Sequence, residues 1–155
     1  MILSRKFVKD YIDLDDELSI KQIAEDMTRV GNEYDEARKL VNSSNLIIGE
    51  VLECEMHPDS DHLHVCKVDI GNEVLQIVCG APNIAKGQKV IVALPGAVLP
   101  GDFKISKSMK RGVESNGMIC ALYEIGIDKK FLSEEDKSGI HVLPKESPVG
   151  KDPVK

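Results

Sequence analysis

The 155-residue sequence is poor in aromatic side chains: it has no tryptophan, three phenylalanines and three tyrosines, and none of these lies between positions 46 and 102. Proteins that hold single-stranded nucleic acid without sequence preference stack successive bases on aromatic rings. A long segment without aromatics cannot supply such a row of rings. The composition therefore argues against a single-strand binder of this kind.

Long apolar runs are also missing. No stretch approaches the about 18 consecutive apolar residues that a membrane-spanning helix requires. Residues 1–16 lack the apolar segment of a secretory signal. We therefore expect a cytoplasmic protein with no membrane partner.

The chain has no excess of positive charge either. It carries 20 basic and 26 acidic residues, a net charge of −6, and residues 1–45 hold seven basic against ten acidic side chains. A general binder of polyanions is usually basic, so DNA is not an expected partner. Within residues 103–113, however, no residue is acidic and four are basic: Lys104, Lys107, Lys110 and Arg111. A local positive patch of this kind can decide a partner when the net charge cannot.

Paired Cys-x-x-Cys spacing is absent, which removes the commonest zinc and redox motifs. The four cysteines, at positions 54, 66, 79 and 120, lie inside apolar runs, so we expect buried thiols in a reducing compartment. His57, His62, His64 and Cys66 are close in sequence, but their spacing matches no familiar ligand pattern. We therefore predict no metal site; a zinc-dependent hydrolase built on the three histidines is the alternative that metal analysis would test.

No catalytic motif is recognisable. Segment 80–87 separates two glycines by six residues, whereas a Walker loop has four and then continues with Lys and a hydroxyl residue. No nucleophile stands at a local spacing from a base and an orienting acid. We predict no catalytic residue in this chain.

The sequence does contain two helical patterns near its start. Ser4 can cap a first helix, and Ser19 can cap a second one that Gly31 would end in a left-handed conformation. We assign residues 1–41 to a helical segment and 42–45, Asn-Ser-Ser-Asn, to a linker.

Beyond the linker, the pattern changes to short segments rich in Val, Ile and Leu, separated by Gly, Pro and Asn. Such segments are typical of β-strands, and residues 71–73 have the length of a hairpin connection. Many short strands without alternating helices favour a small closed barrel over an α/β sheet. The predicted strands are 46–56, 63–70, 74–79, 90–94, 103–105, 118–122 and 139–143.

Five motifs, in this order, resemble those of a known family. They are HPDSDHL at 57–63, VDIG at 68–71, IVCGAPN at 77–83, ALPGA at 93–97 and RGVESNGM at 111–118. Together they are similar to the tRNA-binding module with an OB-fold barrel that is appended to several aminoacyl-tRNA synthetases. Residues 1–31 are similar to the start of the bacterial phenylalanyl-tRNA synthetase β subunit, so the resemblance covers essentially the whole chain.

The resemblance implies a mainly β fold with α. It consists of an OB-fold-type closed β-barrel over 46–150, a preceding two-helix segment that is part of an interrupted α+β domain, and a truncated tail over 151–155. It also implies an N-terminal fragment that is not itself an enzyme and holds no cofactor. The parent assembly would be an ATP-dependent phenylalanine–tRNA ligase using ATP and Mg. The expected partners are tRNA and, through the full-length β subunit, the synthetase α subunit.

The resemblance places RNA-facing residues near the last motif. The predicted tRNA-binding set is Lys104, Lys107, Lys110, Arg111, Ser115, Asn116, Gly117 and Met118. Lys and Arg pair with phosphates, and Ser and Asn donate to phosphate or 2′-hydroxyl groups, which suits a folded RNA held by its shape. Three alternatives stay open: Met118 is equally suited to the core, the barrel could act mainly as a scaffold in the α/β assembly, and the chain could be a free-standing tRNA-binding protein.

Overall fold

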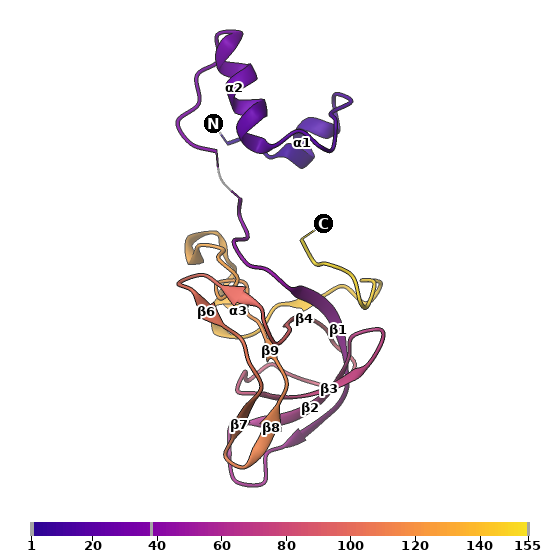
Figure 1. Cartoon of the computed structure of the whole chain (residues 1–155). Helices are drawn as coiled ribbons and strands as arrows, with labels where there is room; N and C mark the ends of the chain where they lie inside the picture. Colours follow the sequence, from indigo (N-terminus) through magenta and orange to yellow (C-terminus); the bar gives the residue numbers. More distant parts are fainter. Residues whose placement is uncertain (1, 38, 155) are drawn as a thin grey trace. The chain divides into compact units, whose positions relative to one another are not determined.

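The computed structural model describes residues 2–37 and 39–154 and divides into two compact units, Met1–Lys39 and Leu40–Lys155. The smaller unit holds two helices, and the larger unit holds all the described strands (Figure 1). Among the described residues, no helix is long and apolar enough to cross a bilayer.

The smaller unit contains the two helices that the sequence predicts: α1, Arg5–Lys9, and α2, Ile20–Arg29. The Ser19 hydroxyl accepts a hydrogen bond from the amide three residues further on and so caps the start of α2. At the other end, Gly31 adopts φ 98° and donates its amide to the Thr28 carbonyl. A glycine in this left-handed position commonly ends a helix, and it confirms the predicted stop.

The larger unit is built on an antiparallel sheet with the strand order β10-β4-β1-β2-β3, in which β9 also pairs with β4. The Asn116 amide, just before β9, donates to the Gln76 carbonyl of β3 at 2.8 Å and nearly closes the sheet. The predicted mainly β barrel fold is thus confirmed. The strand bounds are β1 Leu46–Met56, β2 His64–Asp69, β3 Val74–Cys79, β4 Lys89–Ala93, β9 Met118–Ile119 and β10 Val142–Leu143.

Two predicted strands are shorter by three residues in the structure: β9 ends three residues before its predicted end, and β10 begins three residues after its predicted start. The strands predicted at 63–70 and 103–105 are shorter by two residues and one residue. The chain leaves β9 where the Glu124 carboxylate accepts a hydrogen bond from the Ala121 amide. Before β10, both the N–H and the C=O of Ile140 bond to the side-chain amide of Asn83. In both places a side chain bonds a backbone group that a strand would pair: Glu124 from three residues further along the chain, and Asn83 from a distant segment.

Between β4 and β9, residues 94–117 form two small hairpins, and we call this segment the β4–β9 excursion. Gly96 and Gly101, at φ 93° and 81°, make the predicted turns after Pro95 and Pro100. After β9 come a short 3-10 helix and an α-helix that the sequence analysis did not predict. The bounds are β5 Val98–Leu99, β6 Phe103–Lys104, β7 Ser108–Lys110, β8 Val113–Ser115, η1 Lys129–Phe131 and α3 Glu134–Ser138.

The barrel interior is aliphatic. Val51, Val68 and Ile77, from three neighbouring strands, are fully buried. Gly49 allows the strands to approach closely, because a Cβ at that position would lie 2.6 Å from a Val68 methyl and 3.0 Å from a Val92 methyl. Burial of this apolar surface drives folding, and it fixes β1 and β2, which carry one loop of the candidate site.

The cysteines contribute to the same interior. Cys66, Cys79 and Cys120 are buried, whereas Cys54 is half-buried with its Sγ 3.8 Å from the Sγ of Cys66. Burial raises the pKa of the Cys66 thiol and raises that of Cys120 to about 12. Buried thiols were predicted, and three of the four positions confirm it; their desolvation makes them poor nucleophiles.

Candidate nucleic-acid interface

Two of the predicted cations stand at the tip of the β7–β8 hairpin. Lys110 pairs with Val113, and the two residues between them, Arg111 and Gly112, have φ 48° and 82°. Positive φ at both central positions defines the two-residue type I′ turn, whose twist matches that of paired strands. The Lys110 and Arg111 side chains are exposed on this turn.

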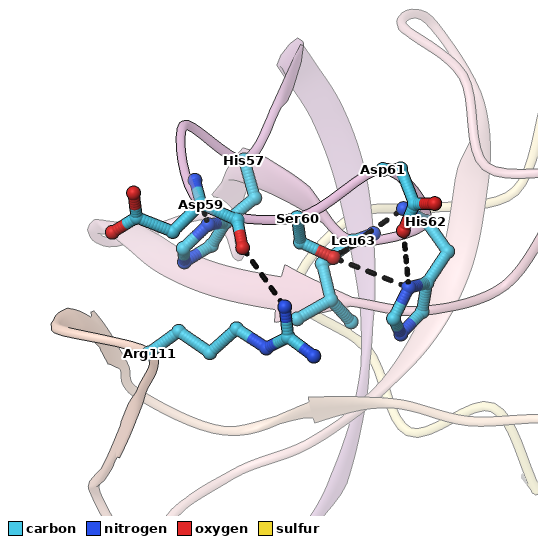
Figure 2. Close-up of polar contacts among 7 residues, drawn as sticks. All are labelled: His57, Asp59, Ser60, Asp61, His62, Leu63 and Arg111. Atoms are coloured by element: carbon cyan, nitrogen blue, oxygen red, sulfur yellow. Dashed lines mark hydrogen bonds and ion pairs between the residues drawn. The ribbon is translucent and has the colours of Figure 1, made fainter.

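The loop that joins β1 to β2, residues 57–63, folds back on itself. The His57 amide donates to the Leu63 carbonyl at 2.9 Å, which closes the base of the loop. Inside it, the Ser60 hydroxyl accepts from the amides of His62 and Leu63 (Figure 2). The motif therefore forms the turn that its Pro, Asp and Ser content predicts.

His57 joins this loop to the β7–β8 turn. Its side chain is only 2% exposed. Its Nδ1 accepts a hydrogen bond from the Asp59 amide at 3.0 Å, so the ring proton must be on Nε2, which donates to the Lys110 carbonyl at 2.9 Å. The Arg111 guanidinium donates to the Asp59 carbonyl at 2.8 Å (Figure 2). Two hydrogen bonds, between residues 53 and 52 positions apart, thus connect the loop and the turn.

The charges at this junction are mixed. The hydrogen bond with the His62 ring, at 3.0 Å, lowers the pKa of the Asp61 carboxyl, and the Arg111 charge lowers it further. Asp61 is therefore ionised at neutral pH and stands fully exposed beside the basic turn. Its negative charge partly offsets the attraction of the turn for an anion.

A groove of about 660 Å³ lies beside the hairpin, between the β4–β9 excursion and the segments around positions 80–82 and 138–140. Five of the eight predicted RNA-binding residues line it: Lys104, Lys110, Ser115, Gly117 and Met118. Lys107, Arg111 and Asn116 do not line it. Phe103 and Tyr123, which the sequence analysis did not select, line it as well.

The Ser-Asn-Gly segment is used in closing the barrel. The Ser115 hydroxyl, on a residue that is 2% exposed, accepts from the Val78 amide at 3.0 Å and donates to the Gly117 carbonyl at 3.2 Å. Gly117 has φ 134°, and a Cβ there would lie 2.8 Å from the Ala93 carbonyl oxygen. The segment thus needs a small hydroxyl residue and a glycine for reasons internal to the fold.

The position of Met118 is compatible with both of its alternatives, the core and the RNA-facing surface. It is half-buried, packs against the cluster that includes Ala93, Cys120 and Ile125, and also lines the groove. The structure also shows roles that sequence reasoning missed: His57 and Asp59 support the basic turn. Both residues belonged to the motif at 57–63, but nothing local pointed to their partners, which lie far away in the sequence.

Two of the histidines considered as metal ligands, His57 and His62, are engaged in hydrogen bonds. The His57 ring is occupied by the two bonds described above, and the His62 ring bonds to Ser60 and Asp61. Within residues 2–37 and 39–154, no three His, Cys, Asp or Glu side chains are placed to hold a metal ion.

Residues 46–152 match the family model described as "Putative tRNA binding domain", and the chain belongs to this family of tRNA-binding domains. It is 47% identical, over 99% of its length, to the phenylalanine–tRNA ligase beta subunit of Geobacillus kaustophilus. It is 49% identical, over 98% of its length, to the beta subunit of Bacillus subtilis.

These alignments cover 19% of each relative, so the chain spans about a fifth of the length of the curated relatives it matches. A solved structure of the MetRS related protein from Pyrococcus horikoshii matches with a TM-score of 0.48 and 25% identity, over 68% of this chain and 84% of that one. The resemblance predicted from the sequence motifs is confirmed by the family match and the ligase relatives.

Proposed function

We propose that the Leu40–Lys155 unit is an accessory tRNA-binding module of a phenylalanine–tRNA ligase β subunit and takes no part in catalysis itself. The family match and the ligase relatives support this role. The ATP- and Mg-dependent chemistry would belong to other parts of a cytoplasmic assembly with the α subunit, and the module would help to hold the tRNA.

The observation that supports this proposal most directly is the junction at His57. Barrels of the OB type bind oligonucleotides with the loops that join strands one to two and four to five. Here, residues 57–63 join β1 to β2, the β4–β9 excursion joins the fourth barrel strand to the fifth, and the His57–Lys110 hydrogen bond brings the two together. The exposed cations of the β7–β8 turn stand at this junction, beside the groove.

The groove and turn suit folded RNA. Lys104, Lys110 and Arg111 would pair with phosphates, and two aromatic rings, Phe103 and Tyr123, are too few for a row of stacked bases. A-form RNA is recognised mainly through phosphates, 2′-hydroxyls and shape. In this proposal, Ser115 shapes the surface from inside and its hydroxyl does not contact the RNA.

Binding of a fluorescent tRNA transcript, followed by anisotropy between about 50 and 200 mM salt, tests the proposal. Reversing both tip charges, Lys110→Glu with Arg111→Glu, should weaken binding about 10-fold or more and reduce the slope of log K against log salt by about two. Unchanged affinity and slope would show that the turn is not the contact surface.

A charge-matched control is available at the other end of the barrel. Lys145 and Lys151 are exposed, and the Lys151 carbonyl bonds to the Ile48 amide, near the start of β1 and far from loop 57–63. Lys145→Glu with Lys151→Glu changes the net charge by the same amount. We expect it to weaken binding far less, because it leaves the groove and the turn intact.

A scaffold role is the second candidate, and two observations favour it. Residues 46–128 hold seven basic against eleven acidic side chains. Phe103 and Met109 are 57% and 64% exposed, which suits a protein partner better than RNA. Deleting the module from a full β subunit and measuring α/β assembly distinguishes the two: a scaffold predicts lost assembly and no tRNA binding by the module.

A further inference from the structure

The β7–β8 hairpin is short, so contacts outside it contribute to the position of its tip. It has three paired positions, and an isolated two-stranded hairpin is marginally stable at best in water. Its base is tied to β3, because the Gln76 side chain donates to the Glu114 carbonyl and the Ser115 hydroxyl accepts from the Val78 amide. These two hydrogen bonds do not involve the turn residues, so other contacts determine the orientation of the tip.

Those contacts come from loop 57–63. Both nitrogens of the buried His57 ring are used, one toward its own loop and one toward the Lys110 carbonyl. A buried polar ring must find partners for both nitrogens, so its position and the position of the turn are determined together. The Arg111 bond to the Asp59 carbonyl adds a second connection between loop 57–63 and the turn (Figure 2).

We infer that His57 is a positioning residue for RNA binding. It holds the Lys110 and Arg111 cations in one orientation before the RNA arrives. Ordering a long side chain at binding costs affinity, and a surface that is ordered in advance avoids part of that cost. Arg111 donates one N–H group to the Asp59 carbonyl. Because a guanidinium has five N–H donors, the others can still bond to a phosphate. The inference rests on the proposed function.

Two substitutions of His57 each keep one of the two hydrogen bonds of its ring and remove the other. In His57→Asn, the amide oxygen can take the place of Nδ1 and accept from Asp59, but the side chain is too short to reach Lys110. In His57→Gln, the amide nitrogen can take the place of Nε2 and donate to the Lys110 carbonyl. Both variants keep a polar side chain at a buried position, and circular dichroism would verify that each is folded.

The test measures tRNA affinity for these variants in the wild-type chain and in a Lys110→Ala/Arg111→Ala background. We expect His57→Asn to weaken binding about 3- to 10-fold in the wild-type chain and His57→Gln to weaken it less than about 2-fold. In the double-alanine background, His57→Asn should have almost no further effect, because interacting residues are not additive.

Two results would overturn the inference in different ways. An equal loss in both backgrounds, or no loss with His57→Asn, would show that His57 supports only the fold, while the proposed function stands. Equal binding by wild type and the double-alanine variant would overturn the inference and the proposed RNA surface together. Hydrogen exchange at the amide of Val113, the register partner of Lys110, should be faster in His57→Asn and measures the coupling without RNA.

Discussion

Substitution of Ser115 tests the structural account most directly, because sequence and structure give its hydroxyl different roles. The resemblance assigns Ser115 to the RNA-facing surface, whereas the structure shows the hydroxyl bonded to Val78 and Gly117 inside the barrel. Ser115→Ala would remove a buried hydroxyl and leave the amide of the half-buried Val78 without its acceptor. An unsatisfied buried group costs about 1–3 kcal/mol. For a unit of this size, that loss corresponds to a Tm lower by about 4–12 °C.

Urea and thermal unfolding followed by circular dichroism measure this cost, and tRNA titration of the folded variant measures affinity. We expect reduced stability with affinity within about 2-fold of wild type. Ser108, the register partner of Ser115, is half-buried and lines the groove. Ser108→Ala is the matched control and should change stability by less than about 0.5 kcal/mol. Wild-type stability combined with clearly weaker tRNA binding would refute the structural account and restore the direct RNA contact.

Two further predictions concern groups whose pKa is shifted in the fold. At about pH 8, a thiol reagent should label Cys54 first, while Cys66 and Cys120 react only on unfolding, because burial raises their pKa and the thiolate is the reactive form; early labelling of either buried thiol would contradict this. The hydrogen bond with His141 lowers the pKa of Asp136, so the carboxylate stabilises the fold above its unfolded pKa and loses that effect as the pH falls through the folded pKa. Asp136→Asn should therefore destabilise the chain at pH 7, by less than about 1 kcal/mol, and have little effect near pH 3; an equal effect at both pH values would contradict the assignment.

Local chemistry made much of the fold predictable. Ser19 and Gly31 mark the ends of α2 through short-range hydrogen bonds and backbone conformation, which depend on only a few neighbouring residues. β1 and β3 have the predicted bounds because their apolar content is itself local information. The family was also determined by the sequence alone, since five ordered motifs carry it.

The contents of the site depend on contacts between distant segments. Sequence alone placed Lys104, Lys107, Lys110 and Arg111 in one basic segment, but the groove includes only Lys104 and Lys110. Where each side chain points depends on how the two hairpins of the β4–β9 excursion pair and twist. No local sequence pattern predicts how these hairpins are arranged.

The same reason explains the two residues whose roles changed most. In the sequence, His57 was a metal-ligand candidate and the first residue of the motif at 57–63, and only the fold brings its ring to the Lys110 carbonyl, 53 residues away. Ser115 belonged to the last of the five motifs, and only the fold turns its hydroxyl inward to Val78. The sequence by itself determined the family, the helix ends and the principal strands; the tertiary structure decided which polar groups remain available to RNA, because barrel closure uses some of them to satisfy buried backbone groups.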